Sequence, residues 1–446
     1  MVLGIEGRSV VGNLRNVVSW STRLAGLVLL FMCFSAGPVS AQAPPAATVY
    51  APPRTTVEDD MAWRKSNQLK WQAALKAIAP TNAETQILVT GSNLHVDRMT
   101  IPKYLPDLPR KVIDVAKRLP EGQLTSPKPR EILLKTMTAR VGELLAENPP
   151  HHPDIQLGLV LLLESLNSNV VTTPPSTVPY TGSYKVLITV LEDPARPLQC
   201  RIHAASALGR IGREAVIGVS GGDLTVLQRS EIAAALARVL TSTPAQGLEA
   251  GKVWFRGRVA EALGDCGVAF DLNNASVFID ALMTTATNPA EHLRVRAACL
   301  RATTQLNWNG STNVPLILHE TAKLLLEVAQ GHNAALVANK RLPNADFQHA
   351  NFDVYLSFNP RTAHQASTLK WGFLNQTTRP GLAQHDPAIK AAYAVALPVI
   401  QQIVSNPKVP VLIPVAQIAA LDAWVKAPAN VPKDRKPTGT SPKAVP

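Results

Sequence analysis

The chain has 446 residues, with 44 Lys and Arg against 32 Asp and Glu, which gives a formal charge of +12. Charged residues make up 17% and apolar residues 46%, so the chain has enough apolar surface for a core and is not wholly disordered. Only four cysteines are present, which excludes a disulfide-dense scaffold. These figures constrain the architecture, but they name no reaction.

The N-terminal leader has the order of a secretory signal. Three arginines precede an apolar run at residues 24–34, and small residues follow up to Ala41. A positive leader, a short apolar run and small residues at the cut define such a signal. The run is shorter than the roughly 20 residues that a spanning helix needs. We therefore expect a signal peptide over residues 1–41, cleaved near Ala41, and export to the periplasm, cell envelope or exterior. The alternative is a retained anchor, and no other apolar run approaches spanning length.

Two proline-rich segments flank the remaining chain. Residues 42–57 are rich in Ala, Pro and Thr, and residues 427–446 combine five prolines with four basic residues. Segments of this composition cannot bury enough apolar surface to offset the entropy of the chain. We expect a Pro/Ala-rich spacer at 42–57 and a disordered basic tail at 427–446.

An internal repeat lies between these segments. Three stretches begin at Cys200, Phe255 and Leu293 and follow the order apolar, Arg, two variable residues, two small residues, one variable residue, two apolar residues and a small one. The third stretch has Arg301 at the second of the two apolar positions. Small residues let neighbouring helices approach closely, and glycine tolerates the positive φ that ends a helix. We expect two glycines of the repeat to end their helices. The structural repeat residues are Arg201, Gly209, Arg256, Gly264 and Arg294.

This pattern resembles the HEAT-like repeat of bacterial proteins, most fully over residues 186–212, in its second half over 248–267, and more loosely over 277–302. The resemblance implies an all-α fold, an α-α superhelix (HEAT/armadillo-like solenoid) of stacked helical hairpins. It implies binding or scaffolding and no chemistry, because the residues shared by the family are structural. In that family the repeated Arg pairs with a loop acid, here Glu192 or Asp193; a basic ridge is the alternative.

Around the repeats we expect an N-terminal helical region at 58–169, a Thr/Pro-rich break at 170–182, and a solenoid at 183–426. The stretch 83–105 is ambiguous between helix and loop. Helices are predicted over 59–79 with a cap at Asp59 or Asp60, and over 107–118, 130–147, 153–168, 314–330, 387–405 and 410–426.

Residues 340–385 lack a helical period and are rich in aromatic residues, so we expect an irregular insertion in the solenoid. A long loop inside a compact domain is usually functional, and a binding insertion is one interpretation. The alternative, which we favour, is an atypical segment that caps the core. The candidate partner-binding residues are Phe347, Phe352, Tyr355, Phe358 and Trp371.

The cysteines are expected to be thiols. Cys33 lies in the leader, and the odd number that remains cannot form a complete set of disulfides. The repeat register also separates Cys200, Cys266 and Cys299 by more than the roughly 7 Å between Cα atoms that a disulfide spans. We predict three separate, buried, unpaired cysteines.

Few patterns point to chemistry. His151 and His152, followed by Pro and Asp154, form the densest metal-like group, but adjacent histidines on a helix diverge by about 100°, so we expect a solvated helix start. The glycine-rich loop 218–223 lacks the Lys-Ser/Thr of a phosphate loop. The sequence also lacks HExxH and CxxCH motifs. We therefore predict no catalytic, cofactor-binding or metal-ligating residues.

The function expected from these features is that of a non-catalytic exported HEAT-repeat protein, an interaction or scaffolding module in the periplasm or cell envelope. Residues 42–446 keep a formal charge of +10, which favours acidic protein partners. Nucleic acid is not expected, because the basic residues are spread along the chain. The alternative is an enzyme or redox-chain component that uses the solenoid as a platform, with a site near 340–385.

Overall fold

The structure is a computed structural model. Its contacts divide the chain into two compact units, Met1–Tyr50 and Ala51–Pro446, and every helix discussed below lies in the second unit. The expected signal peptide lies outside the described residues. The residues that the structure describes are 49–108, 127–172, 175–217, 224–242, 249–339, 345–358, 371–405 and 411–437.

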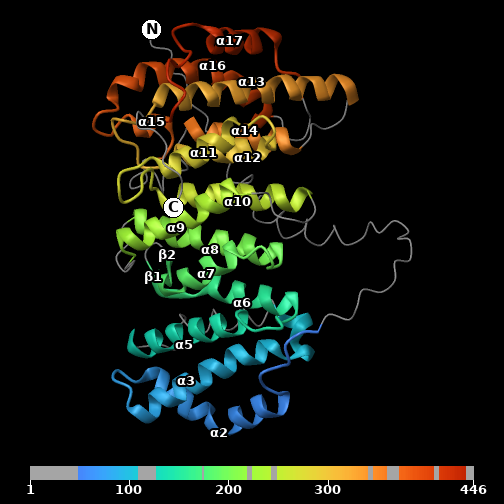
Figure 1. Cartoon of the computed structure of the whole chain (residues 1–446), viewed down its shortest axis with the longest axis vertical. Coiled ribbons are helices and arrows are strands. Elements are labelled where there is room, and N and C mark those ends of the chain that lie inside the picture. The colour runs from blue at the N-terminus through green and yellow to red at the C-terminus, as the bar shows by residue number, and fades with distance from the viewer. Residues whose placement is uncertain are drawn as a thin grey trace, which may run out of the picture. The chain divides into compact units, whose positions relative to one another are not determined.

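Helices dominate the described residues, so the all-α class is confirmed. Short 3₁₀ helices add Arg98–Thr100, Pro102–Asp107, Thr181–Ser183 and Ala383–His385. The α-helices are α2 Val57–Lys76, α3 Asn82–Asp97, α5 Pro127–Leu145, α6 Pro153–Ser165, α7 Tyr184–Glu192, α8 Leu198–Ile217, α9 Val226–Thr241, α10 Glu249–Cys266, α11 Val277–Thr287, α12 Leu293–Thr303, α13 Val314–Asn339, α14 Ala345–Phe358, α15 Phe373–Gln376, α16 Asp386–Ser405 and α17 Val415–Lys426 (Figure 1).

The first two helices are started by threonine caps. The side chain of Thr56, and not Asp59 or Asp60, caps α2 by accepting the Asp59 N–H. In α3, Thr81 and Glu84 form a reciprocal capping box, which satisfies two of the free N–H groups of the first turn. This box resolves the ambiguous stretch in favour of a helix. The helix predicted at 107–118 lies, from residue 109 onward, outside the described residues.

The Thr/Pro-rich break contains a β-hairpin, which the sequence pattern did not reveal. Strand β1 (Asn167–Thr172) pairs antiparallel with β2 (Pro175–Pro179), with an irregular register between Asn167 and Asn169. Proline cannot donate to a strand ladder, so it favours short strands with free edges. The hairpin joins α6 to α7.

The helices contact one another in a regular order. The even-numbered helices from α6 to α16 each contact the next even-numbered helix, α7 contacts α9, and α9 contacts α11. Consecutive helices also pair, as α7 does with α8 and α11 with α12. One apolar cluster extends from Ala74 to Val425. The N-terminal helical region and the repeats therefore share one core.

The repeat glycines do not end their helices. Helix α8 continues past Gly209 to Ile217, and α10 continues past Gly264. The residue with positive φ is Gly267, at 66°, immediately after α10. The expectation of helix stops at the first two glycines was wrong, because Gly209 lies inside α8 and Gly264 lies in the last turn of α10 without the positive φ that Gly267 adopts.

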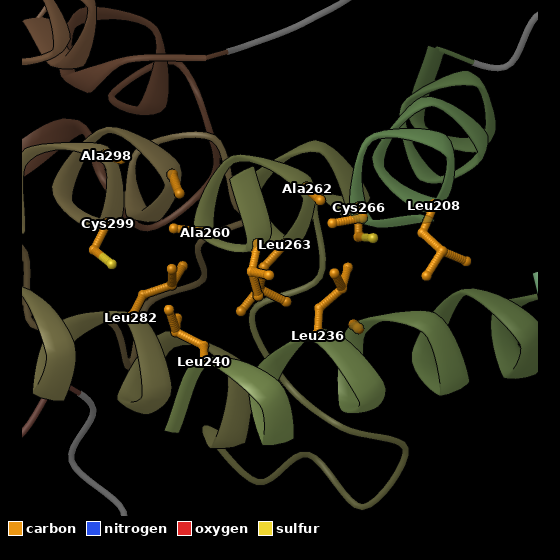
Figure 2. Packing of buried hydrophobic residues seen from close by; sticks show 14 of the residues in the cluster. Leu208, Leu236, Leu240, Ala260, Ala262, Leu263, Cys266, Leu282, Ala298 and Cys299 are labelled. Carbon is orange, nitrogen blue, oxygen red and sulfur yellow. The ribbon is translucent and has the colours of Figure 1, made fainter. Parts of the chain in front are cut away.

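These glycines instead let helices touch. A Cβ on Gly209 would lie 2.8 Å from the Cα of Ala262, and a Cβ on Gly264 would lie 2.8 Å from the Cα of Ala302. Figure 2 shows the packing around this contact, with Leu263 directed toward the neighbouring helices. The spacing of α8, α10 and α12 therefore depends on the missing side chains.

The packing also corrects the repeat register. Arg201 Nε donates to Leu191 O at 2.9 Å, and Arg296 Nε donates to Ala286 O at 3.1 Å. The donor and the acceptor of the second bond each lie 95 positions after those of the first bond. Arg296, and not Arg294, is therefore the equivalent of Arg201. The alignment based on small residues was displaced by two positions in the third stretch.

Two segments expected to be irregular are ordered. Within 340–385, residues Ala345–Phe358 form α14. In the expected tail, residues 434–437 lie against the start of α13: Asn313 Nδ2 donates to the backbone oxygens of Asp434 and Lys436 at 3.0 and 2.8 Å, and Arg435 pairs with Glu320 at 2.6 Å. Residues 438–446 lie outside the described residues.

One helix of the described chain, Ala383–Val404, is long and apolar enough to cross a membrane by length and composition alone. This differs from the expectation that no further run approaches that length. A third of its apolar window is buried, and α16 contacts α13, α14 and α17. Core helices of globular domains meet the same criterion, so the finding is weak evidence for a span.

Candidate functional site

The candidate aromatic residues fall into two groups. Phe358 and Trp371 are buried, and the Phe358 ring lies 5.2 Å from Phe373 and 5.3 Å from Tyr393 between centroids. Phe358 therefore belongs to the core between α14 and α16, Trp371 is buried just before α15, and neither presents an exposed binding surface.

The other three candidates lie on α14. Phe347 and Tyr355 pack against the core, and the Phe347 ring occupies the space above Gly331 of α13. Phe352 is half-buried, and its ring centroid lies 6.5 Å from that of Tyr355. Phe352 and Tyr355 therefore form a partly accessible aromatic pair.

The repeated arginines have structural contacts. Arg201 lies 4.7 Å from the centroid of Phe255 and bonds the carbonyl at the end of α7. Its expected partners pair elsewhere, Glu192 with Arg238 and Asp193 with Arg196. The loop-acid prediction is wrong for Arg201.

The same prediction holds for Arg256, whose Nε lies 2.9 Å from Glu291 in the loop before α12. Arg294 lies 3.7 Å from Asp346 of α14. Arg201 and Arg256 are buried, so they do not form an exposed basic ridge.

Charged residues connect alternate helices near their ends. His203 of α8 lies 2.8 Å from Glu164 of α6, and Arg213 of α8 pairs with Asp265 of α10. These partners are 39 and 52 residues apart. The pairing follows helix packing and has no local sequence signal.

Arg301 is the most deeply buried of the charged residues that link alternate helices. It is buried in α12, 2.9 Å from Asp353 of α14 and 3.6 Å from Glu261 of α10. Burial raises the pKa of Asp353, although the nearby Arg301 favours its charged form. A buried charge requires such a partner, so this contact holds three successive even-numbered helices together.

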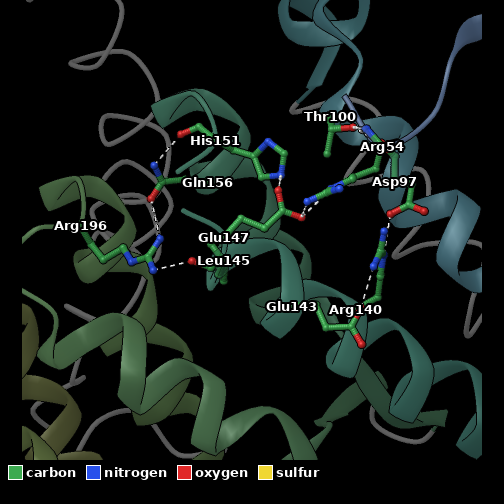
Figure 3. Close-up of polar contacts among 10 residues, drawn as sticks. All are labelled: Arg54, Asp97, Thr100, Arg140, Glu143, Leu145, Glu147, His151, Gln156 and Arg196. Atoms are coloured by element: carbon green, nitrogen blue, oxygen red, sulfur yellow. Dashed lines mark hydrogen bonds and ion pairs between the residues drawn. The ribbon is translucent and has the colours of Figure 1, made fainter. Parts of the chain in front are cut away.

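A second polar cluster surrounds the turn between α5 and α6 (Figure 3). The Arg54 backbone N–H donates to Thr100 Oγ1 at 2.8 Å, and its Nε donates to Glu147 Oε1 at 2.6 Å. The N–H of Ala51 donates to Pro150 O at 3.1 Å. The second half of the expected spacer is therefore attached to the first helices.

His151 completes this cluster. Its side chain is fully buried, with Nε2 2.9 Å from Glu147 Oε2, so the expectation of a solvated turn was wrong for this residue. Burial lowers the pKa of His151, while Glu147 acts in the opposite direction. The neighbouring His152 caps α6 by accepting the Asp154 N–H. Within the described ranges, no group of three or more His, Cys, Asp or Glu side chains could hold a metal ion.

The three described cysteines, Cys200, Cys266 and Cys299, are buried and free, as predicted. Burial raises the pKa of Cys200 to about 12 and raises the pKa values of Cys266 and Cys299 still further. Because the thiolate is the reactive form, these cysteines are inert packing residues.

No family model, curated protein or solved structure matches this chain. The HEAT-like resemblance therefore rests on the residues and packing described above.

Proposed function

We propose that the chain is a non-catalytic, exported protein-interaction or scaffolding module built as a HEAT-like α-solenoid. The observation that carries the proposal is the repeated contact between an Arg side chain and the carbonyl ending the preceding helix, seen at Arg201 and again at Arg296. Two hairpins that repeat the same bond at the same spacing are typical of stacked repeat units.

The order of helix contacts supports the solenoid. In a stack, each unit contacts its neighbours in sequence, and α8, α10, α12 and α14 do so in turn. Glycine and alanine meet at the contacts between α8 and α10 and between α10 and α12. The same close glycine–alanine contact therefore recurs from one repeat unit to the next.

The partner-binding surface of this proposal is the outer side of α14 around Phe352 and Tyr355. Aromatic side chains that are partly exposed on a rigid helix are frequent energetic centres of protein interfaces. The net positive charge of the chain favours an acidic protein partner.

Capture of partners from envelope extracts tests this surface. We would compare the full chain with the double variant Phe352→Ala/Tyr355→Ala, since deleting 340–385 would remove core residues. The matched control is Met61→Ala/Leu69→Ala, which truncates two exposed apolar residues of α2. We expect the α14 variant to weaken capture by about tenfold or more. Its unfolding should remain cooperative, with a modest loss of stability because Tyr355 also packs against the core. Undiminished capture, or an equal loss with the α2 control, would contradict the proposal.

The described part of 340–385 favours interaction over the enzyme alternative. Its buried acid, Asp353, is paired with Arg301, and His349 Nδ1 lies 2.7 Å from the Ala345 carbonyl oxygen. Both groups have structural partners. Export remains part of the proposal through the leader sequence, and N-terminal sequencing of the protein from a secreting host would test cleavage near Ala41.

A further inference from the structure

The segment 434–437 lies across the start of α13 without joining the apolar core. The side chains of residues 434–436 are exposed, that of Arg435 by 63%, and the apolar cluster reaches no further along the chain than Val425. Burial of apolar surface therefore contributes little to holding this segment. It is held by hydrogen bonds and an ion pair, and another peptide segment could make the same contacts.

Asn313 binds the main chain of the segment. Its Nδ2 donates to the carbonyl oxygens of Asp434 at 3.0 Å and Lys436 at 2.8 Å, and its backbone N–H donates to that of Pro437 at 2.8 Å. Its Oδ1 accepts the Leu316 N–H at 3.1 Å, which caps α13 and fixes the side-chain amide. One residue thus binds three carbonyl groups, and none of these bonds depends on the side chains of the segment.

Glu320 binds the arginine of the segment. Its Oε1 lies 2.6 Å from Arg435 Nη1, although only 9% of the Glu320 side chain is exposed. The same carboxylate lies 3.4 Å from His319 and 3.7 Å from Lys323. Burial alone would raise its pKa, but the contacts with His319, Lys323 and Arg435 hold the pKa below its ordinary value of 4.5. The carboxylate is therefore charged at neutral pH, and arginine is well suited to pair with a buried carboxylate.

The two binding residues lie on the same side of α13. Asn313 and Glu320 are seven positions apart, which is two helical turns and about 10 Å along the axis. When an extended peptide adds to the edge of a sheet, main-chain hydrogen bonds supply affinity and side-chain contacts supply specificity. Asn313 and Glu320 divide the two roles in the same way.

The site does not depend on the segment for its own shape. Asn313 remains fixed by its bond to Leu316, and Glu320 keeps Lys323 and His319 as neighbours when Arg435 leaves. Helix α13 itself packs against α14, α16 and α17. A site that is already formed when empty binds a ligand without first paying for its own ordering.

We propose that Asn313 and Glu320 form a binding site for an arginine-containing peptide segment of another protein, and that residues 434–437 fill it as the chain's own competing ligand. The partner segment needs an arginine for Glu320 and accessible carbonyl groups on both sides of that arginine for Asn313. Because residues 434–437 are covalently attached, their effective concentration at the site is on the order of millimolar. A partner must therefore displace them. The site includes none of the α14 residues proposed above.

Amide hydrogen exchange of the full chain measures the release of the segment, because the Asn313 N–H donates to Pro437 O. The variant Arg435→Glu places a carboxylate opposite Glu320 and should accelerate exchange at the Asn313 amide by about tenfold or more. The matched control, Lys433→Glu, makes the same change of charge at an exposed position two residues earlier. It should leave the exchange rate unchanged.

A fluorescein-labelled synthetic peptide of residues 431–437 then represents the partner segment. By fluorescence anisotropy, the Arg435→Glu chain should bind this peptide about tenfold more tightly than the wild-type chain, because the attached competitor no longer fills the site. Adding Glu320→Gln to that chain, or replacing the arginine of the peptide with alanine, should weaken binding by about tenfold or more. Circular dichroism and thermal unfolding check that each variant is folded, and Arg435→Gln is the milder replacement if the charge reversal unfolds the chain.

Three results would overturn the proposal. An Asn313 amide that exchanges at the parental rate in both Arg435 variants would show that Arg435 does not hold the segment. A peptide that fails to bind the released chain would show that the site only fastens the chain's own C-terminal segment. Binding that is equally tight in the wild-type chain and survives Glu320→Gln would place the peptide elsewhere on the protein.

Discussion

Helix glycines in the repeat region and in the N-terminal region meet different neighbours. In the repeats, a side chain on Gly209 or Gly264 would strike the backbone of the next helix. In the N-terminal region, a side chain on Gly91 would strike the Trp71 ring, and one on Gly158 would lie 2.5 Å from Leu108 Cδ2. A backbone cannot move without shifting a whole helix, whereas a side chain can change its rotamer. The repeats are therefore packed at a set spacing, and the first helices are adjustable.

Charged pairs are also more deeply buried in the repeat region than in the N-terminal region. Arg301 is buried between Glu261 and Asp353. Arg54 pairs with Glu147 while 42% of its own side chain is exposed. Burial makes the loss of a partner costly, and solvent screens an exposed pair. We therefore expect single substitutions to destabilise the repeats more than the N-terminal region.

The largest expected effect is that of Arg301→Met. It leaves the Asp353 carboxylate buried without its partner, which should lower the free energy of unfolding by about 3–5 kcal/mol. The matched change Arg54→Met should lower it by less than about 1 kcal/mol. Urea unfolding followed by circular dichroism measures both, and the double variant Arg301→Met/Asp353→Leu should recover much of the loss. Equal effects of the two single changes would remove the distinction between the regions.

A smaller difference is expected between two glycine substitutions. Gly264→Ala should lower the free energy of unfolding by about 2 kcal/mol, because overpacking against Ala302 outweighs the better helix propensity of alanine. Gly158→Ala should stay within about 1 kcal/mol of the parent, since Leu108 can move aside. Thermal and urea unfolding provide the measurement. A more damaging change at Gly158 would reverse the comparison.

The corrected register is tested by two arginines. Arg296→Met removes the bond to Ala286 O and the ion pair with Glu327, and we expect a loss of about 1–2 kcal/mol. Arg294→Met affects a more exposed side chain, 3.7 Å from Asp346, and should cost about 0.5 kcal/mol or less. If Arg294→Met is the more destabilising in urea, the original alignment of the third stretch is correct.

The smallest effect concerns pH and the N-terminal region. Burial holds the pKa of His151 below its ordinary value of 6.5, so the unfolded chain binds this proton more readily than the folded chain. Stability is then complete above pH 6.5 and falls as the pH drops below it, by at most about 1.4 kcal/mol per pH unit. Comparing urea midpoints at pH 7.5 and 5.5 should show a smaller decrease for His151→Gln than for the parent. An unchanged pH dependence would remove His151 as its source.

Much of the helical architecture could be predicted from local pattern. The helices at 130–147, 153–168, 387–405 and 410–426 correspond to α5, α6, α16 and α17 within a few residues. The buried thiols were also predicted, because a cysteine on the apolar side of a helix packs as a small hydrophobic residue. Helical period and side-chain size are short-range properties, and a single sequence carries them.

The misassigned sites share one cause. A glycine such as Gly209 can either end a helix or allow another helix to pack closely. Which of the two roles it has depends on Ala262, 53 positions away in the sequence. Trp371 has a side chain suited to an interface or to a core, and its burial depends on the surrounding helices. The proline-rich β-hairpin was missed because strands this short lack a clear alternating pattern.

The sequence by itself determined that this protein is helical, that Arg and small residues recur along it, and that Cys200, Cys266 and Cys299 are buried. Only the tertiary structure decided that Arg296 and not Arg294 continues the repeat, and that Arg301 joins three helices. The physical reason is range. Helix formation depends on residues three or four positions apart. Burial and charge pairing depend on side chains that folding brings together from 35 to 52 positions away.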